Sequence, residues 1–179
     1  MYTVEMHESS YRTIGELLTK IVAENQHGEG ELLDVGSYDV NGTYRPIVES
    51  LGLSYFGTDM TAGPNVDRVV SAYDLVSLGR EFDIVLSGQA LEHMETPWIA
   101  VEQMRRVLKP GGWLVLTAPA SWPYHPYPLD CWRIRIGGME GLLKGLESVQ
   151  VWEHTVEPDR LVDCYGIGRI PRKCEMLTN

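Results

Sequence analysis

The sequence of 179 residues has few cysteines, no long apolar run and no strongly basic segment. Its three cysteines, Cys131, Cys164 and Cys174, are odd in number and lack a CxxC spacing, which argues against a disulfide framework and against a zinc site. We therefore expect reduced thiols and no metal. No apolar stretch approaches the roughly 20 residues that span a bilayer, so no membrane partner is expected.

Basic residues are outnumbered and stand in short groups, so that the formal net charge is −10. This balance repels nucleic-acid phosphates and anionic membranes, and we expect no nucleic-acid partner. The first residues lack the basic segment and apolar run of a secretory signal, which predicts a cytoplasmic location. The length and the hydrophobic content of 44% predict one domain over residues 1–179.

Helical and strand patterns alternate along the chain. Apolar residues at helical spacing predict a first helix that Ser9 or Ser10 caps and that Gly28 and Gly30 end. We expect strands at 31–35, 54–59, 67–71, 82–87 and 113–118, and helices after Thr43 and at 73–78, 97–108 and 139–146. Strands at 148–156 and 161–168, joined by a turn at 157–159, are close enough to pair antiparallel. The pattern predicts an α/β fold: a Rossmann-like, doubly wound, mostly parallel seven-stranded sheet with a C-terminal antiparallel hairpin.

Ligands of open α/β sheets bind beyond the carboxyl ends of the strands, so the residues that follow each strand are the candidates for a site. Gly36 follows the first strand and permits a tight turn. The dinucleotide pattern GxGxxG is absent because Tyr38 stands where its second glycine would be. Asp34 and Asp39 flank the turn, which favours a cationic ligand over a pyrophosphate. An ordinary strand-to-helix turn stays the alternative.

The second and third strands are each followed by an acid. Asp59 is placed to accept hydrogen bonds from both ribose hydroxyls of an adenosine, and Met60 can pack on the adenine. Tyr73 and Asp74 can meet the polar edge of the adenine. A turn or helix-capping role is the alternative for Asp59, and capping is as good an interpretation for Asp74.

Polar residues also follow the fourth and fifth strands. The segment 87–94 is expected to lie across the cofactor, and we interpret Glu92 and His93 mainly as residues that hold this loop, with acid–base roles as the alternative. The segment 119–133 is rich in proline and aromatic residues, which favours a wall for an acceptor over a rigid loop that packs on the sheet edge. His125 is the best candidate for a general base, because the pKa of histidine can lie near neutrality.

Four motifs together resemble the class I S-adenosylmethionine (AdoMet)-dependent methyltransferases, closest to the group with a type-11 methyltransferase domain. They lie at 32–37 (LLDVGS), 57–60 (GTDM), 82–93 (FDIVLS and LEH) and 106–112 (RVLKPGG), within a resemblance that runs from about Glu31 to Pro119. The long turn through Tyr38 and Gly42 departs from the family pattern. A looser similarity at 130–133, with Cys131 in place of a tyrosine, extends to bacterial relatives often associated with glycan or cell-surface pathways.

The resemblance implies AdoMet as cofactor, S-adenosylhomocysteine as product, and a small-molecule or glycan-type acceptor. The expected cofactor site comprises Asp34, Gly36, Ser37, Tyr38, Asp59, Met60, Tyr73, Asp74, Ser87, Gly88 and Gln89. The expected acceptor site comprises Tyr11, His93, Tyr124, Asp130, Trp132 and Arg133, with His125 as the catalytic residue. A non-catalytic methyltransferase-like module and an NAD-dependent oxidoreductase are the alternatives, and the absence of GxGxxG argues against the latter. Whether the chain forms a homo-oligomer stays open.

Overall fold

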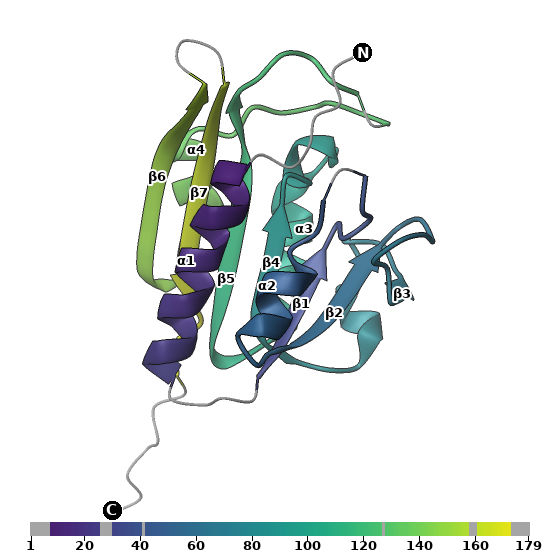
Figure 1. Cartoon of the computed structure of the whole chain (residues 1–179), viewed down its shortest axis with the longest axis vertical. Helices are drawn as coiled ribbons and strands as arrows, with labels where there is room; N and C mark the ends of the chain where they lie inside the picture. Colours follow the sequence, from purple (N-terminus) through teal and green to yellow (C-terminus); the bar gives the residue numbers. More distant parts are fainter. Residues whose placement is uncertain (1–7, 26–29, 41, 127, 158–160, 173–179) are drawn as a thin grey trace, which may run out of the picture.

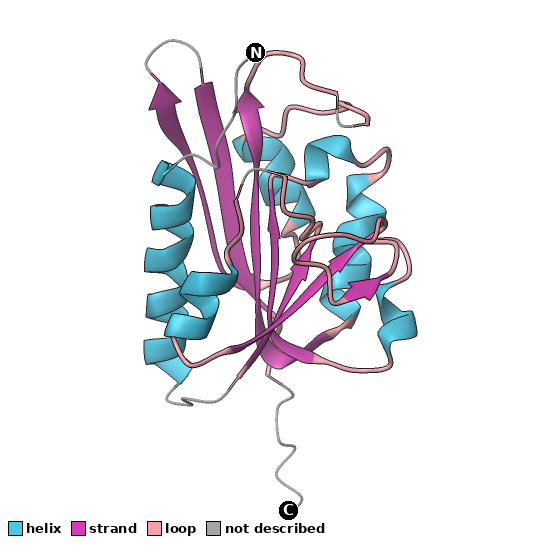
Figure 2. Ribbon diagram, turned by 45° about the vertical axis from the view of Figure 1, so that its right-hand side comes forward, coloured by secondary structure: helices cyan, strands magenta, loops and turns pink. Residues whose placement is uncertain are grey.

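A seven-stranded sheet with helices on both faces forms the molecule (Figures 1 and 2). The computed structural model describes residues 8–25, 30–40, 42–126, 128–157 and 161–172. The strands are β1 (Glu31–Val35), β2 (Ser54–Asp59), β3 (Arg68–Val69), β4 (Phe82–Gly88), β5 (Leu108–Ser121), β6 (Glu147–Glu157) and β7 (Leu161–Arg169). The helices are α1 (Glu8–Asn25), α2 (Arg45–Ser50), α3 (Pro97–Arg106) and α4 (Ile136–Leu142), with the 3₁₀ helices η1 (Leu75–Leu78) and η2 (Leu91–His93).

The strand order is β3-β2-β1-β4-β5-β7-β6, and β7 is antiparallel to both of its neighbours. The remaining neighbouring pairs are parallel. The predicted fold class, including the antiparallel strands at the C-terminal end, is therefore confirmed. Because the chain builds outward from β1 in one direction and then from β4 in the other, the switch point of the sheet lies between these two strands.

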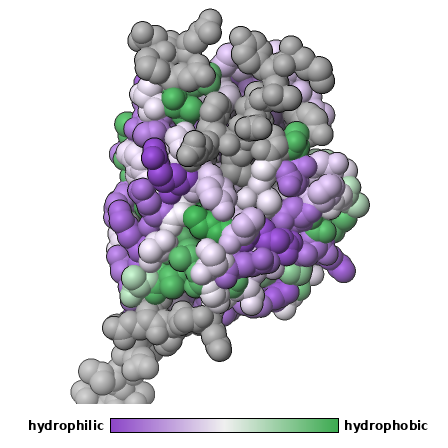
Figure 3. All heavy atoms as spheres, viewed as in Figure 1, coloured by the Kyte–Doolittle hydropathy of each residue, from purple (hydrophilic) through white to green (hydrophobic). Residues whose placement is uncertain are grey.

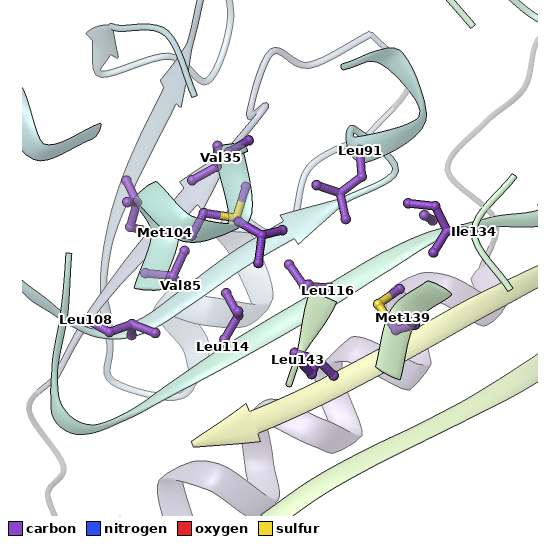
Figure 4. Close-up of a cluster of buried hydrophobic side chains, with 14 of the residues drawn as sticks. Val35, Val85, Leu91, Met104, Leu108, Leu114, Leu116, Ile134, Met139 and Leu143 are labelled. Carbon is purple, nitrogen blue, oxygen red and sulfur yellow. The ribbon is translucent and has the colours of Figure 1, made fainter. Parts of the chain in front are cut away.

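Successive side chains of a strand point to opposite faces of the sheet, so the buried strands contribute apolar residues to a hydrophobic core on each face. In β1, Leu32 faces α1 and α2, whereas Leu33 and Val35 face the layer of α3 and α4. On that second face, the labelled side chains of Figure 4 come from β1, β4, β5, η2, α3 and α4 and from the segment before α4, and Leu116 lies among them. The sequence of a strand that is buried on both faces is a nearly continuous run of apolar residues. For this reason the sequence predicted β4 and β5.

Several predicted boundaries were wrong by a few residues. Ser9 and Ser10 lie inside α1 instead of capping it, and the Ser10 hydroxyl lies 3.1 Å from the Tyr44 hydroxyl. Helix α3 ends at Arg106 instead of 108. Four other elements also differ from their predicted ranges. The helix predicted at 73–78 is the shorter η1, and the strand predicted at 67–71 is the two-residue β3. The strand predicted at 113–118 is the longer β5, and the helix predicted at 139–146 is α4, which begins and ends earlier. The predicted turn at 157–159 lies mostly outside the described residues, as do Gly28 and Cys174.

The motif at 109–112 lies inside β5, where it forms an irregularity in the pairing with β4. The register with β4 jumps from Phe82–Leu108 to Ile84–Trp113, so these residues bulge out of the ladder. Gly111 adopts a φ of 81°, which a side chain would strain. The Lys109 Nζ atom lies 2.8 Å from the Asp83 carboxylate and ties the bulge to β4.

Among the helices that the structure describes, none is long and apolar enough to cross a membrane.

The central core residue Leu116 provides a test of this architecture. We expect Leu116→Ala to lower the free energy of unfolding by about 2–5 kcal/mol, because the side chain is fully buried and its loss leaves a cavity. Val149→Ala, at a side chain on β6 that is 40% exposed, is the control and should change stability far less. Denaturant unfolding measures both, and equal losses in the two variants would contradict the assignment of the core.

Candidate functional site

The turn after β1 is pressed against two neighbouring strands. The backbone N–H groups of Gly36 and Ser37 both donate to the Thr58 carbonyl of β2, at 2.8 and 3.0 Å. Gly36 has a φ of 83°, and a Cβ atom there would lie 2.6 Å from the Cβ atom of Ala90, just after β4. Only glycine satisfies both constraints without strain, so the ends of β1, β2 and β4 converge at this residue.

A hydrogen-bonded network braces the same turn from the side. The Tyr55 hydroxyl donates to Asp34 at 2.6 Å, and the Asn65 amide donates to the Tyr55 hydroxyl and to the Ser37 carbonyl at 2.7 and 2.9 Å. The Arg45 Nε atom donates to the Asn65 side chain at 2.8 Å. The sequence analysis missed Arg45, Tyr55 and Asn65, since their partners are distant in sequence and no local motif signals them.

Asp34 is a buried acid within this network. Its side chain lies on the face covered by α1 and α2, and the residue is only 4% exposed. Burial raises its pKa to about 6, against the opposing effects of the Tyr55 hydrogen bond and of the Arg45 charge. At neutral pH this position therefore holds a carboxylate at an energetic cost, which a nearby cation would relieve.

Asp59 and Met60, at the end of β2, remain accessible. Asp59 is partly exposed, and its Oδ1 atom accepts from the Thr61 N–H at 2.8 Å, which is the turn-forming role held open as the alternative. Met60 is 73% exposed. Tyr38, in the turn after β1, packs on Gly63, where a Cβ atom would lie 2.1 Å from its ring.

Tyr73 and Asp74 lie at the entrance to η1. The Tyr73 hydroxyl accepts from the Thr96 N–H at 3.2 Å. Asp74 is the residue before η1, but its side chain makes no capping hydrogen bond. Capping therefore does not account for this acid.

After β4, the residues 87–89 have distinct roles. The Ser87 hydroxyl is fully buried and donates to the Val35 carbonyl at 3.0 Å, so it joins β4 to β1. Gly88 lies against the Tyr44 ring. Gln89 has a φ of 51°, an uncommon conformation for a residue other than glycine, and its N–H donates to the Thr117 carbonyl at 3.0 Å. Such outliers concentrate at functional sites, where surrounding contacts hold them in place.

The segment between β5 and α4 is fastened by Arg133. Its guanidinium forms two hydrogen bonds to Asp130, at 2.5 and 2.7 Å, and also donates to the carbonyls of Trp122, Pro123 and Trp132. Arg133 holds the pKa of the Asp130 carboxyl well below its usual range. Asp130 and Arg133, predicted to contact an acceptor, thus bind each other and the loop backbone.

The aromatic residues predicted for the acceptor site are dispersed. Tyr124 is 75% exposed, and Trp132 donates from its indole N–H to the Met94 carbonyl at 2.9 Å. Tyr11 stacks on Tyr44, with ring centroids 6.4 Å apart. It also lines an open groove of about 620 Å³ between α1 and α2 with Gly15 and Ile47, where Figure 3 shows apolar side chains gathered. None of the residues that line this groove is among the predicted cofactor-binding residues.

Glu92, His93 and His125 converge at the carboxyl end of β4. The Nε2 atoms of His93 and His125 lie 3.7 and 4.0 Å from the Glu92 Oε1 atom, and the imidazole centroids are 5.3 Å apart. Glu92 is 1% exposed, and burial raises its pKa to about 8. The sequence placed Glu92 beside His93, but only the fold brings His125 to them.

Comparisons with known proteins show which family and fold this chain resembles. Residues 33–116 match the family model described as a methyltransferase domain. A ubiquinone biosynthesis O-methyltransferase of Cereibacter sphaeroides is 29% identical over 117 residues, which are 63% of this chain and 45% of that protein. The chain thus spans about half the length of the curated relatives that it matches.

Solved structures show the same fold over nearly the whole chain. The N-methyltransferase NodS from Bradyrhizobium japonicum has a TM-score of 0.65 at 14% identity, covering 92% of this chain and 98% of that one. The N-terminal domain of EvdMO1, crystallised with S-adenosylhomocysteine and D-fucose, has a TM-score of 0.66 at 16% identity, covering 93% and 84%. The fold is that of Rossmann-like methyltransferases, and the segment 33–116 matches a methyltransferase domain. They confirm the resemblance of this chain to the class I AdoMet-dependent methyltransferases.

The buried Asp34 carboxyl should make stability depend on pH. Because its pKa is about 6 in the folded state and near 3.8 ordinarily, the folded state binds more protons between these values, and stability should fall as pH rises from about 4 to 6. Two pKa units correspond to about 3 kcal/mol at most. Asp34→Asn keeps an acceptor for Tyr55, so it should remove this decline and stabilise the protein at pH 8.

Urea unfolding of the wild type and of Asp34→Asn at several pH values measures this effect. Glu140→Gln, at an exposed position on α4, serves as the control for loss of one charge. Stability curves of the wild type and Asp34→Asn that run parallel from pH 4 to 8 would show that Asp34 is not the group responsible.

Proposed function

We propose that this chain transfers a methyl group from AdoMet to a small-molecule or glycan-type acceptor. The observation that carries the proposal is the meeting of the Gly36 turn, Asp34 and Asp59 at neighbouring strand ends, within a methyltransferase domain. AdoMet, when bound, supplies a methyl group on a positively charged sulfur that leaves as a neutral thioether. The chain must therefore mainly align the acceptor, because no leaving anion needs stabilisation.

The residues present suit such a cofactor. Gly36 lets the backbone approach a ligand, and the buried charge of Asp34 favours a ligand with positive charge. Asp59 is accessible to ribose hydroxyls, and the exposed Met60 offers an apolar surface for the adenine. Tyr38, Tyr73, Asp74 and the segment 87–89 complete the proposed cofactor site.

The segment 122–133 is the proposed acceptor wall, since Arg133 fixes its path while Tyr124 stays exposed. The D-fucose in the EvdMO1 structure supports a sugar-type acceptor, and the named O- and N-methyltransferases support oxygen or nitrogen as the methylated atom. His125 is the proposed base: its Nδ1 atom lies 2.9 Å from the Pro123 carbonyl, so Nδ1 carries the proton and Nε2 keeps a lone pair.

Calorimetric titration with S-adenosylhomocysteine, with NAD as the comparison ligand, tests the cofactor site. We expect binding of the former alone, and Asp59→Ala should weaken it by about 1–3 kcal/mol through loss of charge-assisted hydrogen bonds. Glu140→Ala removes a similar charge outside the site and should leave the affinity unchanged. Selective binding of NAD would support an oxidoreductase, and binding of neither ligand would support a non-catalytic module.

His125→Ala should separate catalysis from cofactor binding. With an acceptor found by screening sugars and phenols against methyl-labelled AdoMet, we expect turnover to fall by about 10²–10⁴-fold. The affinity for S-adenosylhomocysteine should stay within about twofold of the wild type, because His125 lies outside the proposed cofactor site. Full turnover in the variant would leave His125 only a structural role in its loop.

A further inference from the structure

The cluster of Glu92, His93 and His125 has a feature that acid–base chemistry does not require. In both histidines a backbone carbonyl fixes the Nδ1 atom, that of Leu129 at 2.5 Å for His93 and that of Pro123 at 2.9 Å for His125. A carbonyl can only accept, so each Nδ1 atom carries the proton and each Nε2 atom keeps its lone pair. Both lone-pair atoms lie within 4.0 Å of the same Glu92 oxygen.

With Glu92 ionised, three acceptors face one another, and this arrangement is unfavourable unless a proton or a metal ion lies between them. Glu92 is almost completely buried, and its Oε2 atom has no hydrogen-bond partner in the part of the chain that the structure describes. The backbone of Glu92 is itself held in place, because its carbonyl accepts from the Cys131 N–H at 2.7 Å. The carboxylate is thus built into the protein interior with a bonding capacity that the surrounding residues leave open.

We propose that Glu92, His93 and His125 form a binding site for a divalent transition-metal ion. The three candidate ligand atoms lie within 4.8 Å of one another. Two imidazoles and one carboxylate are a ligand set of zinc enzymes and of other transition-metal sites, whereas Mg²⁺ and Ca²⁺ prefer oxygen ligands. The orienting carbonyls at both Nδ1 atoms match the outer shell that metal-binding histidines usually have.

The geometry needs little change to accept an ion. Two ligand atoms about 2.1 Å from one ion at a tetrahedral angle are about 3.4 Å apart. The observed separations of 3.7 and 4.0 Å are about 0.3 and 0.6 Å longer, and all three candidate atoms lie within 4.8 Å of one another, so the side chains would have to move closer together around an ion. The side chain of Glu92 is 1% exposed and those of His93 and His125 are 21% and 39% exposed, so solvent reaches the site from the histidine side. Three protein ligands leave at least one coordination position for an exogenous oxygen.

An ion here would serve the proposed methyl transfer, and this consequence depends on the proposed function. An acceptor hydroxyl bound in the open position would lose its proton to water more easily, because the ion lowers its pKa. The oxygen then forms a bond to the methyl carbon, the carbon–sulfur bond breaks, and its electron pair stays on the sulfur. With the ion bound, the Nε2 lone pair of His125 would be held by the metal, so the ion would take over the activation of the acceptor that is proposed above for His125 as the base of the metal-free site.

The site can be tested on the purified protein without cofactor or acceptor. After removal of metals with a chelator, calorimetric titration with ZnCl₂ should show one equivalent bound, and Co²⁺ should give the visible absorption of a site with nitrogen ligands. We expect His93→Ala, His125→Ala and Glu92→Gln each to weaken Zn²⁺ binding by at least about tenfold. His154→Ala, at a histidine on β6, is the matched control and should bind like the wild type.

Circular dichroism of each variant shows whether it is folded, and Glu92→Gln preserves the side-chain shape if the histidine variants are unstable. Failure of the wild type to bind Zn²⁺ or Co²⁺, or equal affinity in wild type and His125→Ala, would overturn the metal site. Neither result concerns the binding of S-adenosylhomocysteine, so the two proposals fail separately. Loss of turnover in chelator, restored by Zn²⁺, would further assign the ion to catalysis.

Discussion

The site depends on how closely the chain can approach itself at Gly36. Because this residue has no side chain and a positive φ, the β1 turn closes on the Thr58 carbonyl while it contacts Ala90. Asp34, two residues earlier, and Asp59, one residue after Thr58, are thereby held at adjacent strand ends. A larger residue at this position would separate β1 from the segment after β4, and with it the acids from Glu92 and His93.

Stability and chemistry place opposite demands on the buried acids. Asp34 and Glu92 both have pKa values raised by burial, so each of them costs free energy in its ionised form. A core built for stability alone would hold apolar residues there. A cation would relieve this cost at each acid: in our two proposals it is the positively charged cofactor for Asp34 and the metal ion for Glu92.

The sequence predicted the parts of the fold that depend on local pattern. The bounds of β1 and β2 were correct because their runs of apolar residues end at polar or glycine residues, and the antiparallel hairpin followed from the short interval between two strands. The start of α1 was wrong because Ser9 and Ser10 favour a cap locally, although the helix extends through them. The end of α3 was placed at 108 instead of Arg106, because Val107 and Leu108 continue the apolar spacing of the helix although Leu108 begins β5.

The site was less predictable, since its geometry depends on residues distant in sequence. Asn65 and Tyr55 brace the turn through hydrogen bonds that no motif indicates. Asp130 and Arg133 were predicted to contact an acceptor because they are charged residues in an aromatic loop. The sequence does not indicate that their side chains bind each other, since this depends on how the loop folds. The role given to His125 likewise depends on Glu92, which reaches it from another strand end.

The position of β7 has a consequence for synthesis of the chain. This strand fills the place between β5 and β6, although it follows both of them in sequence. Until it emerges from the ribosome, one whole edge of the long and largely buried β5 has no neighbour, and an open apolar edge invites pairing with other chains. During synthesis, the parallel strands β1 to β5 are therefore complete before β7 is available to cover the edge of β5. Protection by a chaperone would matter most during that interval.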